Sequence, residues 1–397
     1  MRAKSRVVVV GASIGGLTAA ETLRQEGFDG DIILIGDEPH RPYNRPPLSK
    51  QIISGEWEPA DAYIRGETEI NDLAIELRKS CTAEALDVAG RVLCTSTGQI
   101  AFDELIIATG TEPRRHPLAP LALTLRTIDD AVTLREGLRS AQRVAVIGPG
   151  ILGSEIASAA RKYGADALVI GRSGTLTFGG VGSLLTEQLA ALHRENGVEL
   201  ALDTEIVRVD SRASGSSILF ASGRVERADL VVAMIGGDPR TTWLSSSTLT
   251  IDNGVVCDAT GLAAPGISAV GDVAAWRDPY TGKAIRVEHQ SNAIEQAISV
   301  AMRLVHDEIG ARPVPLFWSE LHQTRINAFG WFDPERPLIG FNGDSASFSQ
   351  PRVLVSQDES GSVHGVVGWN APPREFRVAR AAVAESAAMT PTLSPQS

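Results

Sequence analysis

The sequence predicts an α/β fold that contains two nucleotide-binding strand–helix–strand units, and three observations lead to that prediction. A chain of 397 residues is too long for one core and long enough for two or three domains. Short apolar strand runs alternate with helical patterns along it. Two of these runs end in glycine-rich turns, at Gly11 and at Gly148, that lead into helices. The pattern therefore favours a multidomain protein with two Rossmann-like dinucleotide-binding domains.

The first unit begins with the apolar run 6–10, turns at Gly11, and continues through a helical pattern to a second strand at 31–35. Gly11 permits the tight turn, and Gly16 lets helix and strand approach each other. Ser13 stands where the second glycine of the fingerprint usually lies, and a small side chain still fits there. The helix N-terminus offers N–H groups and a positive dipole end to a pyrophosphate.

A carboxylate for the cofactor ribose follows the second strand of this unit. Asp37 lies at the end of that strand, at the distance from the glycines where an acid holds ribose hydroxyls. Glu38 is the second candidate for the same role. This unit therefore has the parts of a complete dinucleotide site.

The second unit, "VAVIGPGILGSEIA", carries all three fingerprint glycines, Gly148, Gly150 and Gly153, between an apolar strand and a helical pattern. Two such units in one chain imply two bound dinucleotides. That combination suggests a flavin and a nicotinamide nucleotide.

The formal net charge of −11 argues against attraction of the whole chain to nucleic acid or to an anionic membrane. The first residues do not have the pattern of a signal peptide, and no apolar run approaches the roughly 20 residues of a spanning helix. A cytoplasmic protein is expected, and the sequence leaves the oligomeric state open.

The cysteines Cys81, Cys94 and Cys257 lie far apart and form no CxxC pair and no zinc-ligand spacing. No metal site is expected. Each is predicted to be a small, buried or half-buried apolar residue.

Two further strand ends have the same character and give the chain a family resemblance. "FDELIIATGTEPR" (102–114) ends in a Thr-Gly turn, and "GISAVGDVA" (266–274) ends in Gly-Asp. With the two fingerprints, these resemble the two-dinucleotide flavoprotein reductases of glutathione-reductase-like fold. The stretches 41–50, 125–131, 286–297 and 316–321 narrow the resemblance to ferredoxin reductases of the putidaredoxin reductase type, which serve Rieske-type oxygenases and bacterial cytochromes P450.

The resemblance implies the domain layout. It predicts a discontinuous FAD domain with an inserted NAD(P) domain, then a C-terminal α/β domain and a disordered tail. The corresponding ranges are 1–112 with 243–310, then 113–242, 311–385 and 386–397.

The resemblance also implies which residues bind FAD and the nicotinamide nucleotide. Asp272 is expected at a ribityl hydroxyl or flavin phosphate, and Arg45 and Arg126 at the pyrophosphate side. The full expected set is Gly11, Ser13, Gly16, Asp37, Arg45, Lys50, Thr109, Gly110, Arg126, Gly271, Asp272, Glu288, Trp318, Gly148, Gly150, Gly153, Arg172 and Gly236.

Catalytic roles are implied for Lys50, Glu155 and Trp318. In the family the lysine lies beside the flavin ring, paired with the glutamate, and its charge favours the anionic reduced flavin. The tryptophan lies against the ring, where a flat aromatic shields it.

The end of the second strand in the nicotinamide unit departs from the family. NADH-using relatives have a glutamate for the ribose where this chain has Gly171, followed by Arg172. Loss of the acid removes repulsion against a 2′-phosphate, and Arg172 is placed to pair with it. The prediction is that NADPH is used as well as or better than NADH, and that Gly171→Glu restores discrimination for NADH. The alternative is that the loop binds either nucleotide poorly.

The function implied is transfer of electrons from NADH or NADPH, through FAD, to a [2Fe–2S] ferredoxin. Dithiol and single-cysteine reductases of this fold are disfavoured because the loop "PYNRPPLSK" contains no cysteine. A flavin hydroxylase stays open in principle, although such enzymes do not usually carry a second fingerprint. The main alternative is a redox or signalling flavoprotein like the apoptosis-inducing factors, with weak turnover.

A docking surface for an acidic ferredoxin is expected near the C-terminus. Arg374, Arg377 and Arg380 recur at helical spacing, which predicts that they lie along one side of a helix. The alternative is an ordinary solvated helix face.

Overall fold

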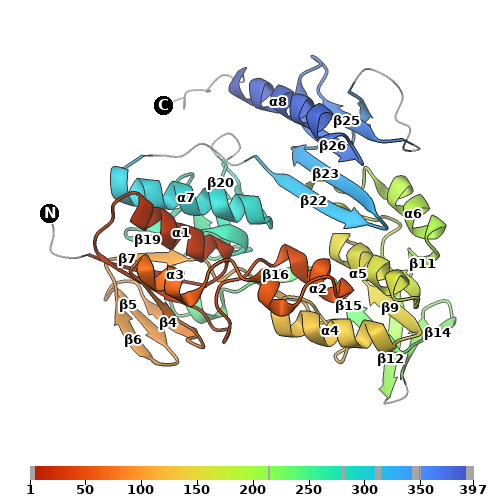
Figure 1. Cartoon of the computed structure of the whole chain (residues 1–397), viewed down its shortest axis with the longest axis horizontal. Helices are drawn as coiled ribbons and strands as arrows, with labels where there is room; N and C mark the ends of the chain where they lie inside the picture. The colour runs from red at the N-terminus through yellow and green to blue at the C-terminus, as the bar shows by residue number, and fades with distance from the viewer. Residues whose placement is uncertain are drawn as a thin grey trace. The chain divides into compact units, whose positions relative to one another are not determined.

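The computed structural model describes residues 5–212, 215–278, 282–308, 314–341, 348 and 350–389, and it confirms the predicted α/β class (Figure 1). The chain divides into two compact units. The first consists of Met1–Asn44, Ala62–Glu112 and Gly237–Pro313, and the second of Arg45–Asp61, Pro113–Gly236 and Val314–Ser397. Each unit contains one of the two predicted Rossmann-like sheets.

A six-stranded sheet in the order β18-β19-β7-β1-β2-β3 forms the centre of the first unit, and its neighbouring strands are parallel except β18 and β19. The strands are β1 (Arg6–Val10), β2 (Asp31–Ile35), β3 (Ile75–Arg78), β7 (Glu104–Ile107), β18 (Leu262–Ala264) and β19 (Ile267–Ala269). Both predicted strands of the first fingerprint, 6–10 and 31–35, are confirmed.

Both faces of this sheet are buried, which explains why its strands are continuous apolar runs. Val7 and Val9 pack with the helices α1 (Ile14–Gln25) and α7 (Gln290–His306), which lie side by side in Figure 1. Val8 and Val10 pack on the opposite face. That face is covered by the antiparallel strands β4 (Ala83–Asp87), β5 (Val92–Thr95) and β6 (Gly98–Ala101).

Short elements complete the first unit and the segments in which the chain passes from one unit to the other. They are α3 (Glu67–Asp72), β8 (Thr111–Pro113), β16 (Gly237–Pro239), β17 (Val255–Cys257), β20 (Ala274–Arg277), β21 (Ala284–Arg286) and the 3₁₀ turns η2 (Pro59–Ala62), η4 (Thr242–Leu244) and η5 (Gly271–Val273). Strands β8 and β16 pair where the chain leaves and re-enters the unit.

The second unit contains a parallel sheet in the order β11-β10-β9-β15. Its strands are β9 (Arg143–Ile147), β10 (Asp166–Ile170), β11 (Val198–Ala201) and β15 (Leu230–Ala233). The helices α4 (Ile128–Ser140), α5 (Ile151–Lys162) and α6 (Thr186–Glu195), the turn η3 (Gly179–Val181) and the antiparallel ribbon β12 (Ile206–Arg212), β13 (Gly215–Phe220) and β14 (Val225–Ala228) belong to the same part.

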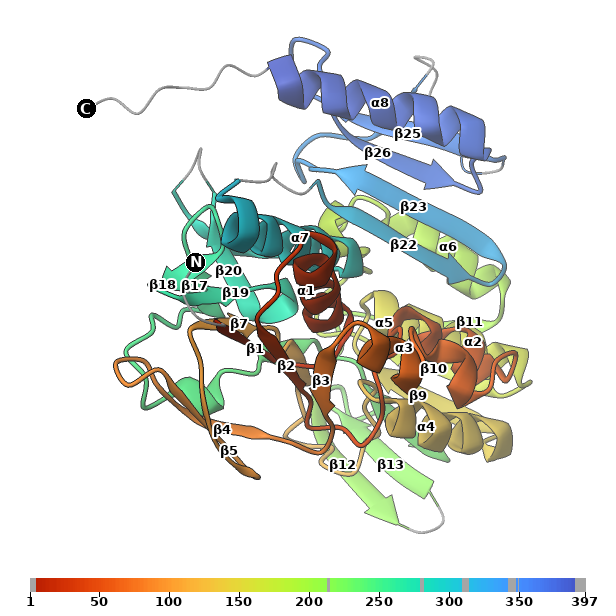
Figure 2. The ribbon, with the colours of Figure 1, turned by 60° about the vertical axis from the view of Figure 1, so that its left-hand side comes forward.

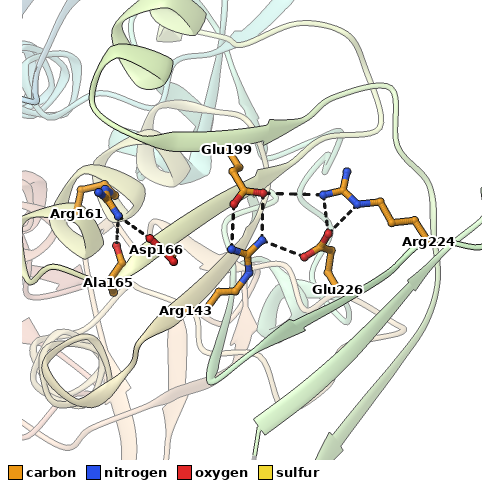
Figure 3. A network of polar contacts seen from close by, with 7 residues as sticks. All are labelled: Arg143, Arg161, Ala165, Asp166, Glu199, Arg224 and Glu226. Carbon is orange, nitrogen blue, oxygen red and sulfur yellow. Dashed lines mark hydrogen bonds and ion pairs between the residues drawn. The ribbon is translucent and has the colours of Figure 1, made fainter.

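A network of ion pairs connects the edges of this part (Figure 3). Arg143 at the start of β9 pairs with Glu199 of β11 at 2.9 Å and with Glu226 of β14 at 3.0 Å. Arg224 extends the network to Glu226. These bonds join strands distant in sequence, so their role is to hold the ribbon against the parallel sheet.

The C-terminal part of the second unit is an antiparallel sheet covered by one helix (Figure 2). The strand order is β22-β23-β26-β25-β24. The bounds are β22 (Leu316–Leu321), β23 (Thr324–Gly330), β24 (Ile339–Gly340), β25 (Arg352–Gln357), β26 (Val363–Trp369) and α8 (Pro373–Met389). Val383 and Ala379 of α8 pack in a core with Val355 and Val366.

The segment Arg45–Asp61 belongs to the second unit, although the sequence placed it within an FAD domain at 1–112. It forms the 3₁₀ turn η1 (Pro46–Ser49) and the short helix α2 (Gln51–Ser54), and α2 packs against α4 and α5. Tyr163 donates a hydrogen bond to the Ile53 carbonyl at 2.9 Å. These contacts, distant in sequence, explain the difference.

Residues 314–389 are likewise not a unit of their own, because they share a core with the part that contains β9 and α6. Leu185 and Leu189 pack in one cluster with Leu321 and Ile326. The domain ranges 113–242, 243–310 and 311–385 therefore stay a prediction. Helix α8 reaches Met389, so residues 386–389 are helical where a disordered tail was expected, and 390–397 lie outside the described residues. Within the described part, no helix combines the length and apolar character needed to cross a membrane.

Candidate functional site

The first glycine-rich turn is a close backbone cradle in front of helix α1. Gly11 has a φ of +117°, and a Cβ on it would lie 2.2 Å from the Ala108 carbonyl oxygen. A Cβ on Gly16 would lie 2.0 Å from the Gly11 oxygen. Ser13 is the N-cap, so α1 begins directly after the turn. The backbone can therefore approach a pyrophosphate at the positive end of α1, and the FAD contact predicted here stays a prediction.

Asp37, the predicted ribose acid, forms an ion pair with Arg240 at 2.6 Å. The Thr109 hydroxyl donates to the Arg240 carbonyl at 3.0 Å, and the Arg240 N–H donates to the Gly110 carbonyl at 2.9 Å. The Thr-Gly turn thus fixes the backbone of Arg240, and the guanidinium of Arg240 pairs with the Asp37 carboxylate. Glu38, the second candidate, accepts a hydrogen bond from Tyr43 at 2.5 Å.

Gly271, Asp272 and Glu288 are connected through Arg286 and α7. Gly271, with a φ of +74°, donates its N–H to the buried Gln296 side chain at 2.8 Å. Arg286 donates to the Asp272 carbonyl at 3.1 Å and pairs with Glu288 at 2.6 Å. Arg286 therefore joins Asp272 and Glu288, whereas Gly271 is held by Gln296 of α7.

In the second unit, Lys50, Glu155 and Trp318 come together from three chain segments. Lys50 Nζ lies 2.8 Å from Glu155 Oε1 and 4.6 Å from the centroid of the Trp318 ring. Glu155 is 4% exposed, whereas Trp318 on β22 is 39% exposed. An ammonium is thus held between a buried carboxylate and an accessible aromatic face.

Two serines complete the coordination of that carboxylate. Ser319 donates to Glu155 Oε1 at 2.5 Å, and Ser49 donates to Oε2. A buried carboxylate is costly unless charge and hydrogen bonds compensate it, and here one cation and two hydroxyls do so. Hydrogen bonds on both oxygens fix the plane of the carboxylate, which in turn fixes the position of Lys50.

Arg45 and Arg126 also lie together in the second unit. Arg45 donates to the Arg126 carbonyl at the start of α4. The N–H groups of Arg126 and Thr127 both donate to the Asp130 carboxylate at 2.9 Å, within the capping box of this helix. Their predicted cofactor contact stays a prediction.

The second glycine-rich turn repeats the geometry of the first. Gly148 has a φ of +121°, and a Cβ on it would lie 2.1 Å from the Met234 oxygen. A Cβ on Gly153 would lie 2.0 Å from the Gly148 oxygen. Gly150 is the N-cap of α5. Gly236, with a φ of +91°, accepts a hydrogen bond from the Arg114 N–H at 2.9 Å.

Gly171 and Arg172 follow β10 as predicted, the first buried and the second exposed. His116 lies within electrostatic range: burial lowers the pKa of its imidazole, and the charge of Arg172 lowers it further. The Nδ1 atom of His116 is buried and has no hydrogen-bond partner among the described residues. Arg172 is therefore the source of positive charge at this strand end, because the lowered pKa leaves the His116 imidazole neutral.

A family model described as "Pyridine nucleotide-disulphide oxidoreductase" matches residues 5–297. The chain belongs to the pyridine nucleotide-disulphide oxidoreductase family. It is 33% identical to rhodocoxin reductase of Rhodococcus erythropolis over 97% of this chain and 91% of that protein. It is 32% identical to the 3-phenylpropionate/cinnamic acid dioxygenase ferredoxin–NAD(+) reductase component of Photorhabdus laumondii, over 96% of both. The covalent putidaredoxin reductase–putidaredoxin complex matches with a TM-score of 0.89, 27% identity and coverage of 97% and 94%.

This member of the pyridine nucleotide-disulphide oxidoreductase family has no cysteine pair for disulfide chemistry. Its cysteines are all free, with Cys81 and Cys257 buried and Cys94 half-buried. Burial raises the pKa of Cys257 to about 12, so this thiol is not a nucleophile at neutral pH. Within the described residues no group of His, Cys, Asp and Glu is arranged to hold a metal.

Proposed function

We propose that this chain is an FAD-dependent NAD(P)H:ferredoxin oxidoreductase of the cytoplasm that delivers electrons to a [2Fe–2S] ferredoxin. The ferredoxin would serve a cytochrome P450 or a Rieske-type oxygenase. The observation that carries the proposal is the repetition of one backbone cradle, at Gly11 and at Gly148, in a chain without a cysteine pair. Two dinucleotide sites and no dithiol favour electron transfer to a separate acceptor.

The first unit supplies the FAD site in this proposal. Gly11, Gly16 and the N-terminus of α1 bind the pyrophosphate, and Asp37 accepts hydrogen bonds from the adenosine ribose. Arg240 orients that carboxylate. When bound, FAD supplies two-electron exchange with a nicotinamide and one-electron exchange with an iron–sulfur centre.

The residues around Glu155 position one fixed positive charge. Glu155, Ser49 and Ser319 hold Lys50 in place, and Lys50 and Trp318 keep the roles at the flavin ring that the family resemblance implies. A preorganised ammonium stabilises negative charge without reorganisation during the reaction.

The second unit supplies the nicotinamide nucleotide site, with Gly148, Gly150, Gly153 and the start of α5 at the pyrophosphate. The exposed guanidinium of Arg172, directly after β10, favours NADPH at least as much as NADH.

An absorption spectrum and a steady-state assay test the proposal. The purified protein should show the bands of tightly held, non-covalent FAD, and NADPH or NADH should drive rapid reduction of ferricyanide. Folded protein that lacks flavin bands and cannot be reconstituted would refute the FAD site. Flavin-loaded protein with only weak turnover would support the alternative of a redox signalling flavoprotein instead.

A further inference from the structure

The two dinucleotide units of this chain can be superposed residue by residue at the strand that follows the fingerprint helix. In the first unit the Gly11 N–H donates to the Ile35 carbonyl at 2.8 Å, and in the second the Gly148 N–H donates to the Ile170 carbonyl at 2.9 Å. The strand registers agree, because Val10 pairs with Ile35 and Ile147 with Ile170. Gly171 therefore corresponds to Gly36, and Arg172 corresponds to Asp37.

The glycine at this strand end has no room for a side chain in either unit. A Cβ on Gly36 would lie 2.7 Å from Cβ of Ala12. A Cβ on Gly171 would lie 2.7 Å from Cγ of the Pro149 ring, and 3.2 Å both from its Cβ and from Cδ2 of Leu202, which ends a flexible side chain. The φ of Gly171 lies outside the left-handed region. Its backbone therefore accepts any residue, and the steric block from Pro149 is the reason for glycine.

Neither side of this contact can move away easily. Gly171 donates its N–H to the Ala201 carbonyl at 3.0 Å and accepts from the Thr204 N–H at 2.9 Å. The Pro149 carbonyl accepts from the Thr177 N–H at 3.1 Å, and a proline ring has no rotamer that swings out of the way. An acid at position 171 consequently has no room in this backbone, and the expectation that Gly171→Glu restores NADH discrimination is not supported.

We infer that Arg172, the counterpart of Asp37, is the residue that determines nucleotide specificity, and that it selects the 2′-phosphate of NADPH. A carboxylate in this position accepts hydrogen bonds from ribose hydroxyls, whereas a guanidinium in the same position donates to a phosphate. Pro149 reinforces the choice because it keeps a carboxylate out of position 171. The inference rests on the proposed function and names the specificity residue of its nucleotide site.

Two groups near Arg172, a neutral histidine and an acid, enter the test. His116 lies within electrostatic range of Arg172. Asp203 is an exposed acid on the adjacent loop, and its N–H donates to the Ser173 carbonyl at 3.2 Å. If Asp203 accepted the ribose hydroxyls, it would favour NADH in spite of Arg172.

The test compares kcat/KM for NADPH and NADH in the flavin-loaded protein. Arg172→Asp should shift the ratio toward NADH by about 10- to 100-fold, because one charge-assisted contact is exchanged for its opposite. Arg139→Asp, an exposed arginine of α4 with the same charge change, should leave the ratio at the wild-type value. Gly171→Glu should lower kcat/KM for both nucleotides without this shift. A Pro149→Gly/Gly171→Glu double variant should gain NADH preference.

Three results would overturn the inference. The first is an unchanged NADPH/NADH ratio of kcat/KM in Arg172→Asp, and the second is a switch to NADH by Gly171→Glu alone. The third is a larger change in that ratio from Asp203→Asn than from Arg172→Asp. Failure of both nucleotides to reduce the wild-type flavin would instead refute the proposed function. If Gly171→Glu does not fold, Gly171→Ala serves in its place. Gly171→Ala should lower Tm more when Pro149 is present than in the Pro149→Gly background. Equal losses of Tm in the two backgrounds would show that Pro149 is not the source of the steric block.

Discussion

Lys50 is the residue whose replacement tests the cluster around Glu155 most simply. Lys50→Met removes the ammonium but leaves the FAD cradle of the first unit intact. We expect FAD to stay bound while NADPH reduces it about ten- to a hundredfold more slowly, since one positioned charge is worth roughly 1–3 kcal/mol. Stopped-flow absorbance under anaerobic conditions measures the rate.

Lys162→Met is the matched control, because Lys162 on the same helix α5 as Glu155 forms an exposed ion pair with Glu56. It should keep the wild-type rate. An unaltered rate in Lys50→Met would remove Lys50 from the mechanism.

Loss of Lys50 also leaves the Glu155 carboxylate buried without its cation, so stability should fall. Removing one partner of a buried ion pair costs about 3–5 kcal/mol. Lys50→Met/Glu155→Gln should recover part of that loss in urea unfolding, because the buried charge is gone. A double variant no more stable than Lys50→Met would show that the carboxylate is not the source of the loss.

Ser319 is expected to act through Glu155. Ser319→Ala removes one hydrogen bond to a buried carboxylate and should cost roughly 1.5–3 kcal/mol of unfolding free energy. It should also slow flavin reduction, since Lys50 is then held less firmly. Ser158→Ala, which removes only an acceptor for the His322 N–H, should lower stability without slowing reduction. Equal reduction rates in both variants would make Ser319 merely structural.

At the residue scale, Lys50 does pair with Glu155, as the family resemblance implied, and Trp318 lies beside Lys50. The roles of these residues at the flavin ring stay a prediction. The sequence analysis did not name four residues that support the site, because their partners lie far away in the sequence or bond through the backbone. These residues are Ser49, Ser319, Arg240 and Arg286. Ser49 and Ser319 do stand inside the quoted motifs "PPLSK" and "LFWSEL", which was the available signal.

Helix α8 carries a prediction about docking. Arg374, Arg377 and Arg380 are all exposed on it, and Arg380 also lies 4.2 Å from the centroid of the Phe329 ring. We expect reversal of all three to Glu to slow ferredoxin reduction several-fold at low ionic strength while ferricyanide reduction is retained, because a basic face accelerates encounter with an acidic partner. The comparison of the two acceptors separates docking from flavin chemistry.

A matched control reverses Arg208, Arg212 and Arg227, which are exposed on the ribbon of β12 and β14. That variant has the same change in net charge. If both triple variants slow ferredoxin reduction equally, net charge and not α8 sets the rate.

The elements themselves were predictable to different degrees. The strands β1 and β2 match the expected ranges because buried apolar runs between turn residues leave little choice. Helix α8 runs further than the tail prediction allowed, through 386–389, where small residues with good helix propensity continue the pattern. The register of the C-terminal sheet depends on pairs such as Phe329 with Val366 that no local pattern specifies.

At the scale of the whole molecule, a buried histidine pair predicts how stability depends on pH. His193 on α6 is 0% exposed, and its Nδ1 lies 3.1 Å from Nε2 of His322. Burial lowers the pKa of His193 to about 4, and the charge of His322 adds to this. Burial also lowers the pKa of His322 to about 4, with a further contribution from Arg161.

The unfolded chain, with histidine pKa values near 6.5, takes up protons first as the pH falls. The contribution of this pair to stability is therefore complete above pH of about 6.5 and is lost progressively toward pH of about 4. His322→Asn should show a smaller fall in Tm over this range, since asparagine tolerates the positive φ of 49°. His306→Asn, at an exposed position, should behave as wild type, and an equally steep fall in His322→Asn would contradict the account.

The assignment of Arg45–Asp61 to the second unit was the part of the layout that sequence could not supply. Segment Arg45–Asp61 joins the second unit through the Lys50–Glu155 pair and the Tyr163 hydrogen bond, all to residues more than a hundred positions away. The family resemblance had implied one FAD domain over 1–112 and 243–310, and those bounds stay a prediction. The shared core of Leu185 and Leu321 likewise joins parts that sequence motifs separate.

The central claim is that this chain passes electrons from a nicotinamide nucleotide, through FAD, to a ferredoxin. The most direct measurement is the visible absorbance of a [2Fe–2S] ferredoxin under anaerobic conditions, with NADPH in excess and the flavin-loaded protein at catalytic concentration. The account predicts that the ferredoxin bands bleach through many turnovers per flavin, at a rate proportional to the amount of protein. Bleaching no faster than in the absence of the protein, while the same sample still reduces ferricyanide, would contradict it.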